Sequence, residues 1–288
     1  MTSAPKQQLV SPAIAENASP STLLLTIAGF DPSAGAGILA DIKTFAAHGL
    51  YGMACITALT VQSTLGVRGV EPVAAHTVDE TLVSLAGDVQ FSAIKIGMLA
   101  TGELVQVVAA FLRSQPGIPV VLDPILQSSS GASLLDASGQ RRLRQDLLAL
   151  ATWITPNINE LAALTGRPLS ATKAETEASA QALLEMAARL GNPDLRIVVT
   201  GGHAHPASNP DDLFLTSHGS HWVPGEWVET NATHGTGCTF SSALAARLVL
   251  GDADLPAVEA AKAYVTGALR AAQPIGHGKG PVHHFWRT

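Results

Sequence analysis

The stretch Asn231-Ala-Thr-His-Gly-Thr-Gly-Cys-Thr239 runs directly into a helical pattern of small residues over 240–250. A Gly-x-Gly loop that opens a helix leaves several backbone N–H groups unpaired and directed the same way. The helix dipole adds positive potential there, so such a loop suits a phosphate or a developing oxyanion. Cys238 stands at the mouth of the loop, where a thiolate would be stabilised. The alternative is a tight glycine turn with a small buried cysteine, and the loop alone leaves both open.

Outside this loop, short apolar runs alternate with helical patterns along the chain. The runs that predict strands are 23–28, 53–61, 93–97, 120–123, 153–155 and 196–200. Helical patterns cover 38–47, 79–88, 103–114, 139–150, 157–165, 173–190, 237–250 and 256–272. This alternation predicts an α/β fold with a mostly parallel sheet and helices on both faces. Residues 211–215 and 221–223 are typical of an antiparallel hairpin near the edge of that sheet.

Composition limits the class of protein. The chain has 288 residues, of which 47% are hydrophobic and 14% charged, and this supports a large core. We predict a single domain over residues 22–288, because no linker interrupts it, with residues 1–21 as a disordered leader. The net charge of −6, the lack of Lys/Arg-rich runs and the few aromatic residues argue against a nucleic-acid-binding protein.

The two cysteines and the hydropathy pattern indicate the compartment. Cys55 and Cys238 lack the spacing of a metal site, and two lone thiols do not make a disulfide framework. The first twenty residues lack the apolar segment of a secretory signal, and no apolar run has the length of a membrane span. We therefore expect a cytoplasmic protein without membrane contact.

The loops at the strand ends carry the polar residues that a binding site needs. In open parallel sheets, ligands bind beyond the carboxyl ends of the strands. The loops predicted there are 29–37, 62–66, 97–99, 123–131, 156–160 and 201–203. The first of them lacks the Gly-Lys-Ser/Thr end of a P-loop. It offers backbone close to a ligand, with Asp31 and Asp41 beside it; the alternative, which we favour from the residues alone, is that Asp31 caps a turn and Asp41 is a solvated helix residue.

A second polar motif follows the predicted strand at 153–155. Asn157 and Glu160 are three residues apart at the start of a helix, so they share one face. Together with Asp123, they would suit Mg²⁺ held through water next to a nucleotide phosphate. The structural alternative is a capping box in which Asn157 and Glu160 satisfy the first turn of the helix, and both interpretations can hold at once.

The ten histidines do not predict a metal site. His203 and His205 come nearest to a ligand pair, and His283 and His284 are adjacent. No third ligand with a fitting spacing accompanies them, so we do not expect a catalytic metal bound by histidine.

In this order, the motifs resemble the ribokinase-like superfamily, and more closely the hydroxymethylpyrimidine/phosphomethylpyrimidine kinases of thiamine biosynthesis. The matching segments are 25–45, 56–67, 95–99, 154–160, 233–239 and 276–285, and the similarity covers about residues 22–287. The resemblance implies a three-layer α/β/α sandwich, usually dimeric, that uses ATP and Mg²⁺. It also implies phosphorylation of the hydroxymethyl group of 4-amino-5-hydroxymethyl-2-methylpyrimidine and, in many members, of the resulting monophosphate.

The resemblance also implies roles for individual residues. Gln62 would hydrogen-bond the pyrimidine, because its amide both donates and accepts. The other residues expected around the substrate are Gly29, Asp41 and Met98. Those expected on the nucleotide and Mg²⁺ side are Asn157, Glu160, Thr200, Gly202 and Asp123. The catalytic anion hole would be Gly235, Thr236, Gly237 and Cys238, with Cys238 beside the hydroxymethyl oxygen and residues 60–67 as a flexible segment that covers the pocket.

Two departures from the family pattern concern charge and backbone shape. Thr200 stands where the family usually has a Lys that helps to hold ATP phosphates, and Ala34 stands where it has a Gly. The segment after Asp123 also lacks a basic residue. The missing Lys at position 200 keeps a non-catalytic pyrimidine-binding relative open as an alternative. A pyridoxal/pyridoxine kinase of the same superfamily also stays open, because some such relatives have a Cys-bearing Gly loop, although Gln62 and Met98 favour the pyrimidine.

Overall fold

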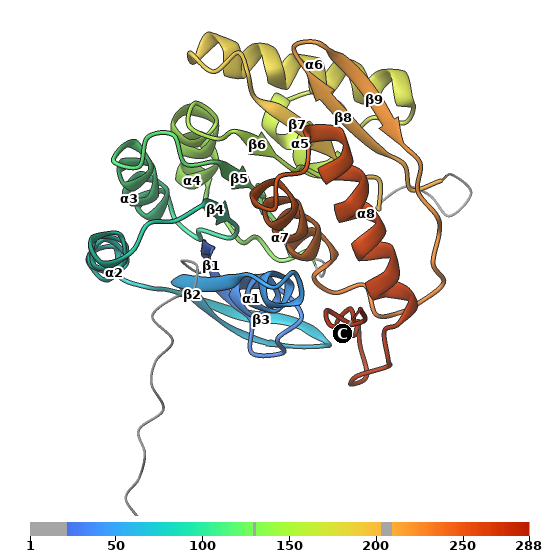
Figure 1. Cartoon of the computed structure of the whole chain (residues 1–288), viewed down its shortest axis with the longest axis horizontal. Helices are drawn as coiled ribbons and strands as arrows, with labels where there is room; N and C mark the ends of the chain where they lie inside the picture. The colour runs from blue at the N-terminus through green and yellow to red at the C-terminus, as the bar shows by residue number, and fades with distance from the viewer. Residues whose placement is uncertain (1–21, 129–130, 203–208, 288) are drawn as a thin grey trace, which may run out of the picture.

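A computed structural model of the chain describes residues 22–128, 131–202 and 209–287, and one sheet lies at its centre (Figure 1). The strands are β1 (Leu23–Phe30), β2 (Tyr51–Ser63), β3 (Gly66–Pro72), β4 (Ala93–Ile96), β5 (Val120–Leu122), β6 (Trp153–Ile154), β7 (Arg196–Val199), β8 (Asp212–Thr216) and β9 (Gly219–Val223). Their order is β3-β2-β1-β4-β5-β6-β7-β8-β9. The six strands from β2 to β7 in this order are parallel, and β3, β8 and β9 are antiparallel.

Helices cover both faces of the sheet (Figure 1). They are α1 (Gly37–Ala47), α2 (Ala75–Asp88), α3 (Gly102–Arg113), α4 (Ala137–Arg142), the π-helical turn η1 (Leu143–Leu147), α5 (Ile158–Thr165), α6 (Lys173–Arg189), α7 (Thr236–Val249) and α8 (Asp254–Arg270). Successive strand residues point to opposite faces. Leu24 of β1 accordingly packs with the core beneath α1, α7 and α8, while Leu25 and Ile27 pack with the core beneath α2, α3, α5 and α6.

The predicted three-layer α/β/α architecture is confirmed. β1 pairs with β2 on one side and β4 on the other, so successive connections leave β1 in opposite directions. Such a reversal opens a crevice at the carboxyl ends of the strands, where α/β proteins place their ligands. The turn at 143–147 divides the predicted helix 139–150.

The sequence patterns did not predict strand β3, so they also did not predict that the covering segment 60–67 is part of a β-hairpin. Residues 60–67 belong to a β2–β3 hairpin in which Gln62 is paired with Val67 next to a shift in register, so the loop predicted over 62–66 shrinks to the turn at 64–65. The cause is local: Gly66 and Gly69 weaken the strand pattern of β3, because glycine has low β propensity. Gln62 therefore projects from a strand rather than a loop.

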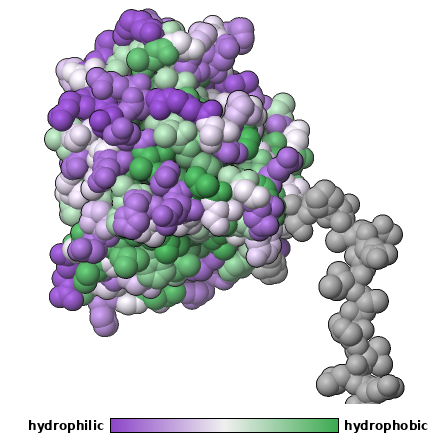
Figure 2. All heavy atoms as spheres, turned by 90° about the vertical axis from the view of Figure 1, so that its left-hand side faces the viewer, coloured by the Kyte–Doolittle hydropathy of each residue, from purple (hydrophilic) through white to green (hydrophobic). Residues whose placement is uncertain are grey.

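Hydrophobic side chains gather on one part of the surface. Figure 2 shows them towards the lower part of the face in view. The exposed large apolar residues of the described chain include Leu59 and Val61 of β2 and Val83 of α2. None of the described helices has the length and apolar character needed to cross a membrane. The predicted leader 1–21 and the pair His203 and His205 lie outside the described residues.

Candidate active site

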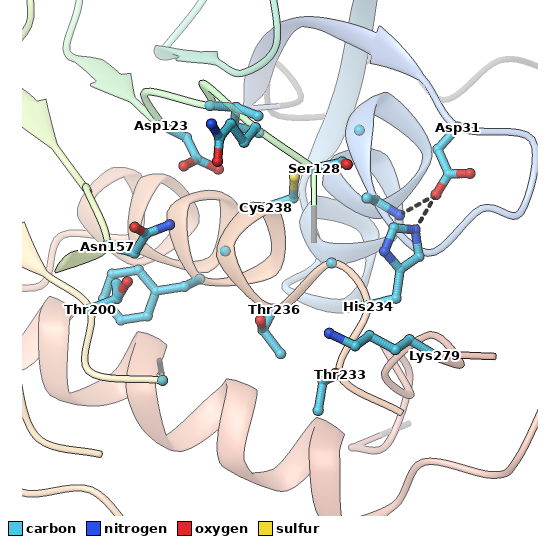
Figure 3. Close-up of a pocket in the computed structure, with 18 of the residues that line it drawn as sticks. Asp31, Asp123, Ser128, Asn157, Thr200, Thr233, His234, Thr236, Cys238 and Lys279 are labelled. Carbon is cyan, nitrogen blue, oxygen red and sulfur yellow. Dashed lines mark hydrogen bonds and ion pairs between the residues drawn. The ribbon is translucent and has the colours of Figure 1, made fainter. Parts of the chain in front are cut away.

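A cavity of about 1060 Å³ opens at the carboxyl ends of the parallel strands. Its walls come from the loops after β1, β4, β5, β6 and β7, from the tip of the β2–β3 hairpin, and from the first turn of α7 (Figure 3). It is large enough for two small ligands side by side. All the predicted site residues except Asp41 line it: Gly29, Gln62, Met98, Asp123, Asn157, Glu160, Thr200, Gly202, Gly235, Thr236, Gly237 and Cys238.

The anion loop is the segment Gly235–Cys238, which opens α7 into this cavity. Gly235 has a φ of +82°, and a Cβ there would lie 1.7 Å from the carbonyl oxygen of Gly35, so only glycine fits. The helix ladder begins with the N–H of Thr239 donating to the carbonyl of Gly235. The N–H groups of Thr236, Gly237 and Cys238 precede that bond and have no partner within the helix. They suit an anion in the cavity.

Cys238 is a neutral thiol in this environment. Its side chain is buried, and burial raises its pKa to about 12, with the charges of Asp123 and Asp41 adding to the effect and that of Lys95 opposing it. The prediction of a stabilised thiolate is therefore wrong, because desolvation outweighs the favourable position at the helix start. The carboxylate of Asp123 lies near the thiol, and each group shifts the pKa of the other. Cys238 and Asp123 thus place a thiol and a carboxylate close together in the cavity lining.

A buried ion pair between Lys95 and Asp41 lies next to Asp123, beneath the cavity lining. The ammonium group of Lys95 lies 2.9 Å and 3.0 Å from the two carboxylate oxygens of Asp41, and 4.0 Å from Asp123. Burial alone would lower the pKa of Lys95, but the charges of Asp41 and Asp123 raise it above its usual value. The hydroxyls of Thr26 and Ser242 also donate to Asp41, at 2.6 Å and 2.7 Å.

Asp41 is therefore neither solvated nor on the cavity wall. Asp41 is fully buried and does not line the cavity. Its carboxylate accepts hydrogen bonds from Lys95 and from the two hydroxyls. The solvated-helix interpretation is wrong because Lys95, 54 residues further along the chain, meets it from β4. The placement also gives no support to direct contact between Asp41 and a substrate.

The opposite end of the cavity carries Asn157 and Glu160. The side chain of Asn157 accepts from the N–H of Glu160 at 2.9 Å, and the carboxylate of Glu160 accepts from the N–H of Asn157 at 2.8 Å. This confirms the capping box. Both side chains also line the cavity, so the cap fixes them there.

Buried acidic groups and an unpaired hydroxyl mark this end as incomplete. Burial raises the pKa of Asp123 to about 6 and, together with the charge of Asp123, raises that of Glu160 to about 8. The hydroxyl of Thr155, on the same wall, has no hydrogen-bond partner among the described residues. Buried polar groups normally have partners, so a ligand or water is expected against it.

This donor set fits a hard divalent cation. Carboxylate oxygens suit Mg²⁺, and the cation would favour the ionised form of both groups, whose pKa values are raised mainly by burial. Within the described residues, no three His, Cys, Asp or Glu side chains converge to hold a metal ion. Asp123 and Glu160 would therefore leave most of the coordination sphere to water and phosphate oxygens.

The protonation of Glu160 gives the first prediction. A carboxyl with a raised pKa in the folded state binds its proton more tightly there than in the unfolded chain, so it lowers stability as pH rises. For Glu160 this penalty is absent below its usual pKa of 4.5 and complete above about 8. Urea denaturation in EDTA at about pH 5.5 and about pH 8 should show a larger loss of stability for the wild type than for Glu160→Gln. An equal loss in both proteins would contradict the raised pKa.

Gln62 faces the anion loop from the other end of the cavity. His234 Nε2 lies 2.7 Å from a carboxylate oxygen of Asp31 and 3.0 Å from the amide of Gln62 (Figure 3 shows the first contact). A carboxylate only accepts, so Nε2 carries the proton and donates it to Asp31. Asp31 also accepts from three backbone N–H groups of its loop, which confirms that it caps the turn. The amide oxygen of Gln62 also accepts from the hydroxyl of Thr60 at 3.3 Å, and the amide lines the cavity beside Gly29 and Met98.

The two family departures have physical consequences. Ala34 has a φ of +58°, the left-handed conformation that favours glycine, so its Cβ strains the turn by about 1 kcal/mol. Thr200 lines the donor end without a charge. Lys262 lines the cavity too, but it is held by Asp212 at 2.8 Å and by the carbonyl of Pro210 at 2.6 Å.

Several site features escape sequence reasoning. The residues concerned are His234, Lys95, Thr155 and Lys279. His234 and Lys95 contact Asp31 and Asp41, which are distant in sequence, and Lys279 lines the cavity from the C-terminal loop. All four lie inside the matching segments 95–99, 154–160, 233–239 and 276–285, but these segments do not reveal which partner each residue contacts or lacks. The sequence signal that could have identified them is a polar residue inside an apolar strand or next to a glycine-rich loop.

An anion loop that faces buried carboxylates across one cavity, on a mostly parallel α/β/α sandwich, defines a small-molecule kinase of the ribokinase-like class. The family profile described as phosphomethylpyrimidine kinase matches residues 31–283. The chain therefore belongs to the phosphomethylpyrimidine kinase family.

Relatives and solved structures agree with this assignment. The hydroxymethylpyrimidine/phosphomethylpyrimidine kinase of Rhizobium meliloti is 41% identical over 267 residues, which covers 92% of this chain and 97% of that protein. The phosphomethylpyrimidine kinase structure from Clostridium difficile has a TM-score of 0.74 and 33% identity, over 86% of this chain and 99% of that one. The ADP complex of Bacillus subtilis pyridoxal kinase has a TM-score of 0.82 and 30% identity, over 92% and 98%.

Proposed function

We propose that the chain transfers the γ-phosphoryl group of ATP to the hydroxymethyl group of 4-amino-5-hydroxymethyl-2-methylpyrimidine, and then phosphorylates the monophosphate. The observation that carries this proposal is the arrangement of one cavity: Gln62 at one end, Glu160 at the other and the anion loop between them. The names of the relatives support the same acceptor.

The acceptor end would hold the pyrimidine by shape and by one amide. Gln62 can donate to a ring nitrogen and accept from an exocyclic amine, and Gly29 and Met98 supply a close apolar wall. The hydroxymethyl oxygen would then lie beside Cys238. Because Asp123 has a pKa of about 6, it is ionised at neutral pH and, lying near the thiol, would take up the hydroxyl proton with Cys238 as the group between them.

The donor end would hold ATP with few charges of its own. Asn157, Thr155, Thr200 and Gly202 line it, and the N–H groups of the anion loop would stabilise the transferred phosphoryl group. Mg²⁺, when bound beside Asp123 and Glu160, would neutralise the charge on the ATP phosphates. Catalysis here rests mainly on positioning and on neutralised charge.

The test is product formation by the purified chain with ATP and Mg²⁺. We expect ADP release that depends on the pyrimidine alcohol, with the monophosphate and then the diphosphate identified by mass spectrometry. Pyridoxal belongs in the same panel, because several similar structures are pyridoxal kinases. Faster turnover of pyridoxal would favour that alternative, and pyrimidine binding without any turnover would favour a non-catalytic relative.

Three further properties stay predictions of this proposal. A homodimer follows from the family resemblance, a single domain over 22–288 from the uninterrupted composition, and a cytoplasmic location from the cysteine usage. Gel filtration with light scattering would test the first.

A further inference from the structure

Lys279 is an unpaired cation on the rim of the cavity. It belongs to the loop after α8, lines the cavity and is exposed, and in the described part of the chain its ammonium group makes no ion pair or hydrogen bond. Figure 3 shows its side chain extending towards Thr233 and Thr236, next to the anion loop. The other lysines near the cavity, Lys95 and Lys262, already have carboxylate partners.

The backbone fixes where Lys279 stands. Its N–H donates to the carbonyl of Thr64 at 2.9 Å, at the turn between β2 and β3. A Cβ on Gly278 would lie 2.0 Å from the same carbonyl, so the chain packs closely against this turn. One residue further on, the carbonyl of Gly280 accepts from the N–H of His234 at 3.0 Å. Lys279 is thus held between the hairpin that carries Gln62 and the anion loop.

This position assigns Lys279 to the acceptor end. Thr64 is two residues from Gln62 on the same hairpin, whereas Asn157 and Thr200 lie on the opposite side of the cavity in Figure 3. A cation at this end is not needed for a neutral alcohol. It matters when the acceptor is itself a phosphate monoester, which carries a charge of about −1.5 to −2 near neutral pH and meets the negative phosphates of ATP.

We propose that Lys279 binds the phosphate already carried by the acceptor during the second transfer, and so determines the use of the monophosphate as a substrate. In that step an oxygen of the acceptor phosphate forms a bond to the γ-phosphorus of ATP. The bond from that phosphorus to the β,γ-bridging oxygen breaks, and ADP leaves with the electron pair. Lys279 offsets the charge that brings the two phosphates into repulsion.

The inference rests on the proposed function, and the test separates the two. Equilibrium binding of the pyrimidine alcohol and of its monophosphate is measured by calorimetry without ATP, and kcat/KM for each acceptor is measured with ATP and Mg²⁺. The variants are Lys279→Ala, Lys279→Arg and, as a control, Lys173→Ala, which removes a surface lysine that does not line the cavity.

For Lys279→Ala we expect monophosphate affinity and kcat/KM to fall about 10-fold or more, the change that one charge-assisted contact gives. Alcohol binding and the KM for ATP should change less than about 2-fold. Lys279→Arg should keep most of the monophosphate activity, and Lys173→Ala should match the wild type.

Equal losses for both acceptors, or a raised KM for ATP alone, would overturn the role of Lys279 while the pyrimidine kinase assignment stands. A wild type that phosphorylates the alcohol but neither binds nor phosphorylates the monophosphate would also overturn it. A wild type that binds and phosphorylates neither acceptor would overturn both proposals.

Discussion

Replacement of Cys238 by alanine should lower kcat for the pyrimidine alcohol by about 100-fold or more, the usual effect of losing a proton-transfer group. The thiol lies at the anion loop and near Asp123, so its removal takes away the proposed path between the acceptor hydroxyl and the carboxylate. The KM for ATP should change by less than about 2-fold, because the backbone N–H groups of the loop remain.

Two variants make this result interpretable. Cys238→Ser keeps a group that donates and accepts, so it should retain more activity than the alanine variant. Cys55→Ala removes the other buried cysteine, which packs in the core and donates to the carbonyl of Val78, away from the cavity. It should leave kcat unchanged. An unaltered kcat in Cys238→Ala would refute the catalytic role of the thiol and leave the backbone anion hole intact.

Replacement of Lys95 by methionine should lower the free energy of unfolding by about 3–5 kcal/mol, the loss typical when one partner of a buried ion pair is removed. Lys95 and Asp41 are both fully buried, so the variant leaves Asp41 charged without its cation. Urea denaturation at neutral pH measures the change.

A double variant distinguishes this charge effect from simple loss of packing. Lys95→Met combined with Asp41→Asn removes both charges. The amide oxygen of asparagine can accept from one of the hydroxyls of Thr26 and Ser242, and its NH₂ group can donate to the other. The double variant should recover a large part of the lost stability, because no uncompensated charge stays buried. Wild-type stability in the single variant, or a double variant less stable than the single one, would contradict the account.

The fold was predictable because its signals are local. Apolar runs that end in Gly, Asp or Pro indicated the parallel strands, and six of them lie within a few residues of β1, β2, β4, β5, β6 and β7. β3 was not predictable in this way, because its two glycines weaken a strand that is stabilised by pairing with β2. The loops at the strand ends indicated most of the cavity, since parallel strands bring their carboxyl ends together.

The contacts inside the site were less predictable, because they join residues distant in sequence. The sequence predicted Asp41 as a helix surface residue, whereas in the structure it is hydrogen-bonded to Lys95 of β4. Cys238 looked like a thiolate because a helix start is visible in the sequence, whereas the burial that raises its pKa is not. Lys279 lies in a C-terminal motif, and only the folded chain brings it beside the hairpin of Gln62.

The central claim concerns the acceptor, and the ratio of kcat/KM for the hydroxymethylpyrimidine to that for pyridoxal tests it most directly. Both acceptors are measured with the wild-type chain at saturating ATP and Mg²⁺. We expect the ratio to exceed about 10, because the amide of Gln62 can hydrogen-bond both a ring nitrogen and the exocyclic amine of the pyrimidine. A ratio below one would contradict the account and identify a pyridoxal kinase.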